Sequence, residues 1–295
     1  MSNKYKIKGH ETFGIREGWI NKGIAAVHDN PRVFSENAGA DALGVGTNMA
    51  KAIRYWLRAA GLIENRKDGS YLTEFGDIIY EMDPYIENVF TLWIIHIHIA
   101  VNKELATSWY LFFMTDTLSE FTKDMMFMEM KRLIELYTEK EDLSERSIGD
   151  DCTVLLHMYG NVHAKEDPEE KKKSPFSELG LLKQEGKWYK KITPKLQYLS
   201  SYVVWYVLNQ MLCKDSQVSI QKLLESPESP GKLLNLGRVE LNHYLDILEE
   251  QGVITVNRTA GLDMVYEKKR EDSLNIIRQY YDSTQEENDG QHDYN

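Results

Sequence analysis

The sequence predicts a mainly α-helical protein with winged-helix-like units near both ends and a helical middle region. Its 295 residues include 11 Met, 6 Trp and 17 Tyr, a composition typical of helical proteins rich in aromatic residues. Apolar residues recur at helical spacing through most of the chain. An amphipathic helix followed by a short hairpin pattern occurs twice, once within residues 43–71 and once within residues 218–269. This repeat predicts the two winged-helix-like units.

The first unit is predicted from residues 43–71, which indicate a turn, a recognition-type helix and a hairpin wing. With successive residues roughly 100° apart around the helix, one side is apolar. This side holds Met49, Ile53, Trp56, Leu57 and Ala60. The opposite side is basic with one aromatic residue, and an amide lies at the helix start: Lys51, Arg54, Tyr55, Arg58 and Asn48. Asp68 and Gly69 predict the tight turn of the wing.

A basic face opposite an apolar face lets a helix pack on its own domain and reach a phosphate backbone. The sequence therefore predicts that this helix and the wing bind DNA. The residues expected to contact DNA are Asn48, Lys51, Arg54, Tyr55, Arg58, Arg66, Lys67 and Arg16. The alternative is an ordinary amphipathic helix with a solvated basic face. The order of turn, helix and wing favours DNA binding.

Helices on either side of this unit are predicted from caps and breakers. Thr12 is expected to cap a helix that runs to Val27. Thr73 is expected to begin a short helix over Glu74–Met82, which Asp83-Pro84 ends because the residue before a proline disfavours helical backbone.

The middle region is predicted to hold long helices. The apolar run Val89–Val101 is too short to cross a bilayer and predicts a helix buried on all sides. An aromatic segment around Trp109 follows, then a helix over Phe121–Tyr137, and Ser144 is expected to cap a further short helix. The apolar side of the helix over 121–137 is expected to hold Met125, Met128, Leu133 and Leu136.

These patterns divide the chain into five predicted parts. Residues 1–82 form an N-terminal helix and the DNA-binding unit, and residues 83–164 form the helical region. Residues 165–213 hold a charged linker, a short strand and an apolar helix. Residues 214–281 form the C-terminal winged-helix-like unit, and residues 282–295 form an acidic tail that is expected to be disordered.

The second unit carries a surface of the opposite sign. Its main helix, expected over Arg238–Gln251, exposes acidic and polar side chains: Glu240, His243, Asp246, Glu249 and Glu250. Such a face repels phosphate. We therefore expect this unit to bind a protein partner or to form a homodimer.

The charge distribution agrees with a local DNA contact. The net charge of the chain is −11, which argues against binding of nucleic acid by the whole surface. Residues 1–70 alone hold eleven Lys and Arg against seven Asp and Glu, a net of +4, which leaves −15 for the remainder. Cys152 and Cys213 lie far apart without metal-type spacing, and the first residues lack an apolar signal sequence. We expect a cytoplasmic protein with two buried free thiols and no membrane segment.

One short segment suggests chemistry. His10, Glu11 and Glu17 lie within eight residues, together with Arg16. This set indicates a phosphate-handling or metal-assisted site, in which a glutamate binds Mg²⁺ or Mn²⁺ or acts as a base. A capped helix start with surface ion pairs explains the same residues.

Two further groups contain potential ligands. Asp150-Asp151, with His157 and His163, is a second acidic candidate, which a polar helix start explains equally well. His96 and His98 point to different sides of one helix, so we expect core histidines without a shared metal.

A set of short motifs resembles one bacterial family. They are Gly9-His10-Glu11-Thr12-Phe13, Arg16-Glu17-Gly18-Trp19, Leu43-Gly44-Val45-Gly46, Asn48-Met49, Ile53-Arg54-Tyr55-Trp56, Leu72-Thr73, Phe75-Gly76, Asp83-Pro84-Tyr85, Thr91-Leu92-Trp93, Trp109-Tyr110 and Ser174-Pro175-Phe176. In this combination the chain resembles the SspB-like family, also known as domain of unknown function 4007.

The resemblance implies a component of a DNA phosphorothioation or phage-defence system that engages DNA and nicks it. It also implies a PAPS-reductase-like sulfurtransferase and an ATPase as partners. A non-catalytic DNA-binding adaptor or regulator is the alternative, because the sequence contains no recognisable nuclease motif.

Overall fold

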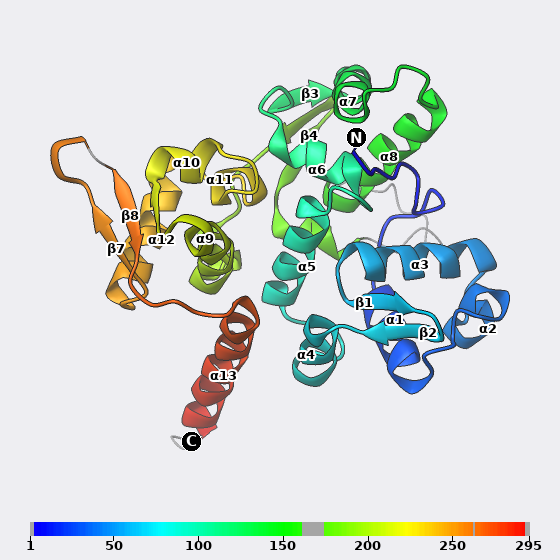
Figure 1. Cartoon of the computed structure of the whole chain (residues 1–295), viewed down its shortest axis with the longest axis horizontal. Helices are drawn as coiled ribbons and strands as arrows, with labels where there is room; N and C mark the ends of the chain where they lie inside the picture. Colours follow the sequence, from blue (N-terminus) through cyan, green and yellow to red (C-terminus); the bar gives the residue numbers. More distant parts are fainter. Residues whose placement is uncertain (1–2, 161–173, 262, 293–295) are drawn as a thin grey trace. The chain divides into compact units, whose positions relative to one another are not determined.

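Helices make up most of the chain in the computed structural model, which describes residues 3–160, 174–261 and 263–292 (Figure 1). The chain forms two compact units, Met1–Lys195 and Leu196–Asn295. The prediction of a mainly helical protein is confirmed. The assignment of winged-helix units stays a prediction. None of the described helices is both long and apolar enough to cross a membrane.

The first unit begins with four helices and a hairpin. In chain order these are α1 (Trp19–Asp29), α2 (Ala40–Leu43), α3 (Thr47–Ala59), β1 (Ile63–Arg66), β2 (Gly69–Leu72) and α4 (Glu74–Met82). Helix α3 packs against α1 and β1 (Figure 1). The predicted helix over 74–82 is confirmed, and Thr73 caps it by accepting a hydrogen bond from the Gly76 amide at 3.0 Å.

Two predictions about this region are wrong. The first helix begins at Trp19 and not after Thr12, because Glu11 and Thr12 have left-handed backbone angles, with φ of 50° and 71°. The hairpin turn lies one residue earlier than expected, since Arg66 pairs with Gly69. Gly69 instead allows the hairpin to approach the backbone of Pro31 closely. A Cβ at this position would lie 2.6 Å from the Pro31 carbonyl oxygen, which is too close for a side chain.

The described rest of the first unit is built on four α-helices, one 3₁₀ helix and one sheet. They are α5 (Val89–Val101), α6 (Thr107–Met114), β3 (Glu120–Thr122), α7 (Lys123–Thr138), α8 (Glu145–Tyr159), η2 (Pro175–Leu179), β4 (Leu182–Glu185) and β5 (Trp188–Lys191). The sheet order is β3-β5-β4, so residues 120–122 pair with residues 188–190. The predicted parts 83–164 and 165–213 therefore share a sheet. The predicted linker Lys165–Lys173 lies outside the described residues.

The core face of α7 differs from the prediction. Met126, Met130 and Ile134 are fully buried, whereas Met128 and Leu136 are 66% and 70% exposed, and Met125 is exposed as well. The helix carries two parallel apolar stripes, and their spacing alone does not determine which one faces the core. Ser144 caps α8 as expected, but that helix is long and includes Asp150, Asp151 and Cys152.

The described part of the second unit holds five α-helices and a three-stranded sheet. Its elements are α9 (Ser201–Asp215), β6 (Gln217–Ser219), α10 (Ile220–Glu225), α11 (Pro230–Leu233), α12 (Arg238–Glu250), β7 (Ile254–Asn257), β8 (Met264–Glu267) and α13 (Ser273–His292). The sheet order is β6-β8-β7.

Two acidic side chains of α12 that were predicted to be available to a partner already form contacts within the unit. The carboxylate of Glu249 accepts a hydrogen bond from the Val256 amide at 2.7 Å, and Asp246 forms an ion pair with Arg258 at 2.6 Å. His243 and Glu250 are exposed as expected. Part of this surface therefore secures the β7–β8 hairpin.

Two other predictions in the second unit are wrong in part. Helix α13 continues to His292, so the predicted disordered tail is helical up to that residue, and residues 293–295 lie outside the described part. Buried Ile276, Ile277 and Tyr281 anchor the start of this helix. Cys152 is buried as expected, but Cys213 is exposed.

Both histidines of α5 lie in apolar surroundings. His96 is fully buried, and its Nδ1 lies 2.9 Å from the Tyr159 hydroxyl. His98 lies against Phe75, with ring centroids 4.4 Å apart, and would collide with a Cβ at Gly61. Burial lowers the pKa of His98 to about 4. The prediction of a core histidine is confirmed for His96, whereas His98 is half-buried.

The depressed pKa of His98 predicts acid sensitivity. The unfolded chain protonates this ring near pH 6.5 and the folded chain near pH 4, so its contribution to stability is fully present above pH 6.5. Between pH 6.5 and 5, wild type should lose roughly 1 kcal/mol more unfolding free energy per pH unit than His98→Gln. Urea unfolding at several pH values measures both slopes. Equal slopes would show that His98 does not titrate differently on folding.

Candidate nucleic-acid interface

The basic face of α3 opens into a pocket of about 290 Å³. Lys51 is exposed there, and Arg54 and Arg58 are half-buried. The N-terminal segment adds Lys6 and Glu11 to the same pocket. Four cations and one carboxylate therefore share this pocket, which favours an anionic ligand.

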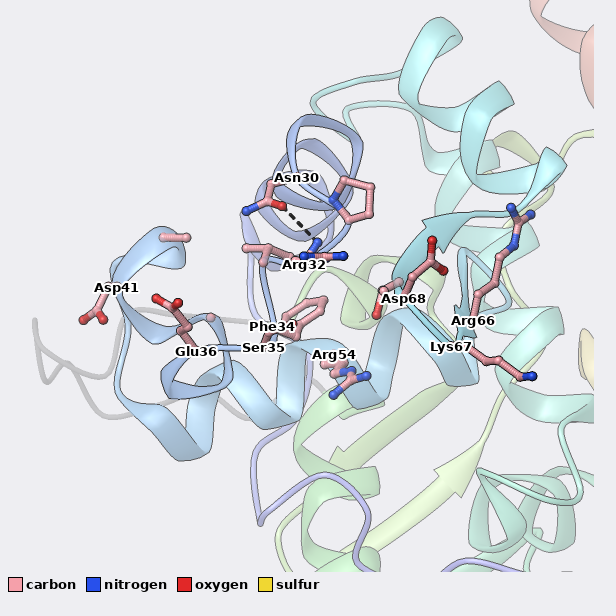
Figure 2. A pocket seen from close by; sticks show the side chains of 16 residues that line it. Asn30, Arg32, Phe34, Ser35, Glu36, Asp41, Arg54, Arg66, Lys67 and Asp68 are labelled. Atoms are coloured by element: carbon pink, nitrogen blue, oxygen red, sulfur yellow. Dashed lines mark hydrogen bonds between the residues drawn. The ribbon is translucent and has the colours of Figure 1, made fainter.

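A larger cleft of about 740 Å³ adjoins this pocket and shares Arg54 with it. Figure 2 shows that its cations come from separate elements: Arg32 from the loop after α1, Arg54 from α3, and Arg66 and Lys67 from the end of the β1–β2 hairpin. Three acidic residues also line it: Glu36, Asp41 and Asp68. The structure thus brings the predicted wing and the predicted recognition helix to one surface.

Arg54 is the central residue of this surface. Its guanidinium lies 5.4 Å from the Phe34 ring centroid, and its Nη2 donates to the side-chain oxygen of Asn65 at 3.1 Å. Its Nε is buried without a hydrogen-bond partner, and no described carboxylate forms an ion pair with it. Burial, and then the nearby charge of Arg58, lower the pKa of Arg54. A buried donor on a cation without a counterion favours binding of an anion.

The wing cations differ in how far they are neutralised. Arg66 forms an ion pair with Glu64 at 2.7 Å and lies 4.6 Å from the Tyr71 ring centroid. A hydrogen bond from the Tyr71 hydroxyl lowers the pKa of Asp68 in the turn. Lys67 is exposed beside them, and no ion pair of it is found among the described residues. Arg32, Arg54 and Lys67 are therefore the cations of the cleft most available to a ligand, since no ion pair of any of them is found among the described residues.

The prediction that Tyr55 lies on the exposed face is wrong. Tyr55 is 5% exposed, and its hydroxyl donates to the Leu105 carbonyl at 2.6 Å. A Cβ at Gly9 would lie 2.3 Å from its ring, so the N-terminal segment covers it. Helix α3 is therefore buried on more than its apolar side. The N-terminal segment and the segment before α6 cover the side that holds Tyr55. Asn48 is exposed, as predicted.

The predicted cluster of His10, Glu11, Arg16 and Glu17 is not one site. His10 is fully buried, and its Nε2 lies 2.8 Å from the Asp151 carboxylate on α8. Its ring stacks on Trp56, with centroids 5.6 Å apart and planes 6° apart. Arg16 and Glu17 line a separate pocket. Only Glu11 joins the basic pocket of α3.

The pairing of His10 with Asp151 was not predicted. Asp151 is 2% exposed and also accepts hydrogen bonds from the Lys8 amide at 2.8 Å and from the Ser108 hydroxyl. The two residues lie 141 positions apart, so no spacing rule connects them. The available signal was the helical spacing of Asp151 from two apolar residues, Ile148 at i−3 and Leu155 at i+4, because an aspartate on a buried helix face needs a partner.

The surroundings of Glu11 do not fit a metal ion held by the protein. The same pocket contains four cationic side chains, which disfavour a divalent cation. In residues 3–160, 174–261 and 263–292, no three His, Cys, Asp or Glu side chains come together as a metal site.

Comparisons with known proteins agree with this architecture. The model of a family described as "Protein of unknown function (DUF4007)" matches residues 7–281. This chain belongs to the DUF4007 family. The predicted family resemblance is thereby confirmed. A search of curated proteins gave no match.

Two solved structures share the fold of this DUF4007 protein. They are described as "Magnesium ion-bound SspB crystal structure" and "SspB crystal structure". Each is 24% identical in sequence, with a TM-score of 0.85, over 95% of this chain and 89% of the SspB chain. At this level of identity the likeness shows a common fold.

The buried contact of Asp151 predicts a large effect on stability. Asp151→Asn replaces one of the two oxygens that accept from His10, Lys8 and Ser108, so these bonds cannot all be kept, and it should cost about 2–3 kcal/mol of unfolding free energy. Asp150→Asn is the matched control, because Asp150 pairs with Lys8 at 2.7 Å in a partly exposed position and should cost no more than about 1 kcal/mol. Urea unfolding measures both. Equal losses would contradict the structural role of Asp151.

Proposed function

We propose that this DUF4007 protein binds the DNA backbone through the basic face of α3 and the β1–β2 turn, which together act as a winged helix. The observation that carries the proposal is Arg54, whose half-buried guanidinium has an unpartnered Nε where two pockets meet. Lys51, Arg58 and Lys67 flank it on the same surface. Seven cationic side chains line the two pockets against four carboxylates, and such a local excess of cations favours contacts with phosphate.

We place this DNA contact within a DNA phosphorothioation or phage-defence system. Membership of the DUF4007 family and the SspB-like fold support this role. The proposed partners are DNA, a PAPS-reductase-like sulfurtransferase and an ATPase. The C-terminal unit, with its partly acidic α12, is the proposed surface for protein contacts or a homodimer.

DNA nicking is the more specific form of the proposal. Glu11 is the carboxylate that the basic pocket presents to a bound phosphate, so it is the candidate base for such a reaction. The Mg²⁺-bound SspB structure motivates assays with Mg²⁺ or Mn²⁺. A non-catalytic DNA-binding adaptor is the second candidate function, because the cations around Glu11 serve binding without any reaction.

DNA binding is tested with a triple variant, Lys51→Ala, Arg54→Ala and Arg58→Ala. Each lost phosphate contact should lower the slope of log K against log salt by roughly 0.9, for all DNA sequences alike. Fluorescence anisotropy with a labelled duplex at several salt concentrations measures affinity and slope.

The control for this experiment removes the same charge from another surface. Lys123, Arg146 and Lys187 are exposed residues of the first unit outside both pockets, so their triple alanine variant should keep the wild-type slope. If both triple variants lost affinity equally, binding would depend on net charge and not on α3. An unchanged affinity in the α3 variant would overturn the proposal.

Nicking is tested with supercoiled plasmid in Mg²⁺ or Mn²⁺. Glu11→Gln should abolish conversion to open circles while DNA affinity stays equal or rises, because the variant removes a negative charge from a basic pocket. Glu17→Gln is the control and should keep activity, since Glu17 lines a different pocket. Failure of the wild-type protein to nick, with intact binding, would favour the adaptor function.

A further inference from the structure

A second pocket of the first unit lies outside the proposed DNA contact. Its volume is about 360 Å³, and three segments line it. These are residues 16–21, residues 85–92 and residues 174–178. The polar members are Arg16, Glu17, Asn21, Tyr85, Glu87, Ser174 and Glu178.

Two hydrogen-bonding atoms of this pocket have no partner. Ser174 is only 7% exposed, and its side-chain Oγ makes no hydrogen bond. The side-chain oxygen of Asn21 is also buried and without a donor. A buried acceptor without a donor is destabilising, so both atoms favour a ligand that donates hydrogen bonds.

The loop after α4 is held in a conformation that completes the pocket. Asp83 accepts hydrogen bonds from the amides of Glu87 at 2.9 Å and Asn88 at 3.1 Å, and from the Thr91 hydroxyl. These bonds fix Ile86 at φ of 56°, which a β-branched residue rarely adopts. The neighbouring Tyr85 is 72% exposed at the pocket rim.

The charge of the pocket favours a cation. Three carboxylates, those of Glu17, Glu87 and Glu178, line the pocket together with one cation, Arg16. Arg16 already stacks on aromatic rings, with its guanidinium 5.5 Å from the Phe13 centroid and 5.4 Å from the Trp19 centroid. A net negative rim repels phosphate, so this pocket does not continue the DNA contact.

We propose that this pocket binds an arginine side chain from a basic segment of a protein partner. A guanidinium carries five donors in a plane, which suits the glutamates and the unpartnered acceptors of Ser174 and Asn21. Its planar face stacks on an aromatic ring such as exposed Tyr85. The described side chains form no three-ligand cluster of the kind that a metal ion needs.

The test uses the full chain and a short probe peptide, acetyl-Gly-Arg-Gly-Arg-Gly-amide. Its partner probe replaces each arginine with citrulline, which keeps the shape and removes the charge. Amide chemical shifts are followed by NMR during titration. The arginine peptide should shift the amides of Gly18, Tyr85 and Glu178, and the citrulline peptide should bind at least tenfold more weakly.

Two variants locate the binding site. Ser174→Ala should weaken the arginine peptide at least threefold without lowering the melting temperature, because folding leaves this hydroxyl unpaired. Glu87→Gln should weaken it similarly, whereas the matched control Glu81→Gln, an exposed residue of α4 outside the pocket, should not.

Three outcomes would overturn the proposal. Equal binding of both peptides would remove the role of the guanidinium charge. Equal effects of Glu87→Gln and Glu81→Gln would show unspecific attraction to an acidic protein. Mg²⁺ alone, if it shifted the same amides while the peptide did not, would make the pocket a metal site.

Discussion

The first unit depends on one buried contact, that between His10 and Asp151. Asp151 on α8 binds the His10 ring and the Lys8 amide, and it also accepts from Ser108 on α6. The His10 ring in turn stacks on Trp56 of α3. One carboxylate therefore joins the N-terminal segment to three helices. Charged and polar groups buried this deeply are stable only when paired, which makes the arrangement cooperative.

This contact also explains how a strained segment reaches the basic face. Lys8, Glu11 and Thr12 all have positive φ values, between 50° and 71°, which non-glycine residues rarely adopt. The hydrogen bonds of His10 and Lys8 hold the segment in this conformation. As a result Glu11 and Lys6 lie beside the cations of α3 and not in a helix of their own. Backbone strain of this kind often accompanies function.

The sequence predicted those features that depend on neighbouring residues. The caps Thr73 and Ser144 and the largely buried α5 were predicted correctly, because each follows from local hydrogen bonding or composition. Wrong predictions concerned the choice between faces: Tyr55 was assigned to solvent, and the exposed stripe of α7 was assigned to the core. Burial depends on contacts distant in sequence, such as Tyr55 with Leu105. For the same reason the sequence joined His10 to Glu17, which the fold separates.

The deep burial of α3 has a consequence for how it meets a duplex. Tyr55 is bonded to Leu105, and the Trp56 indole donates to the Phe13 carbonyl at 2.8 Å, so the helix is held from both sides. Such a helix cannot turn or shift to follow the local shape of a groove. In the proposed complex the DNA must therefore supply the deformation. Sequence preference would then reflect the flexibility of the base steps, with pyrimidine–purine steps favoured, more than contacts with base edges.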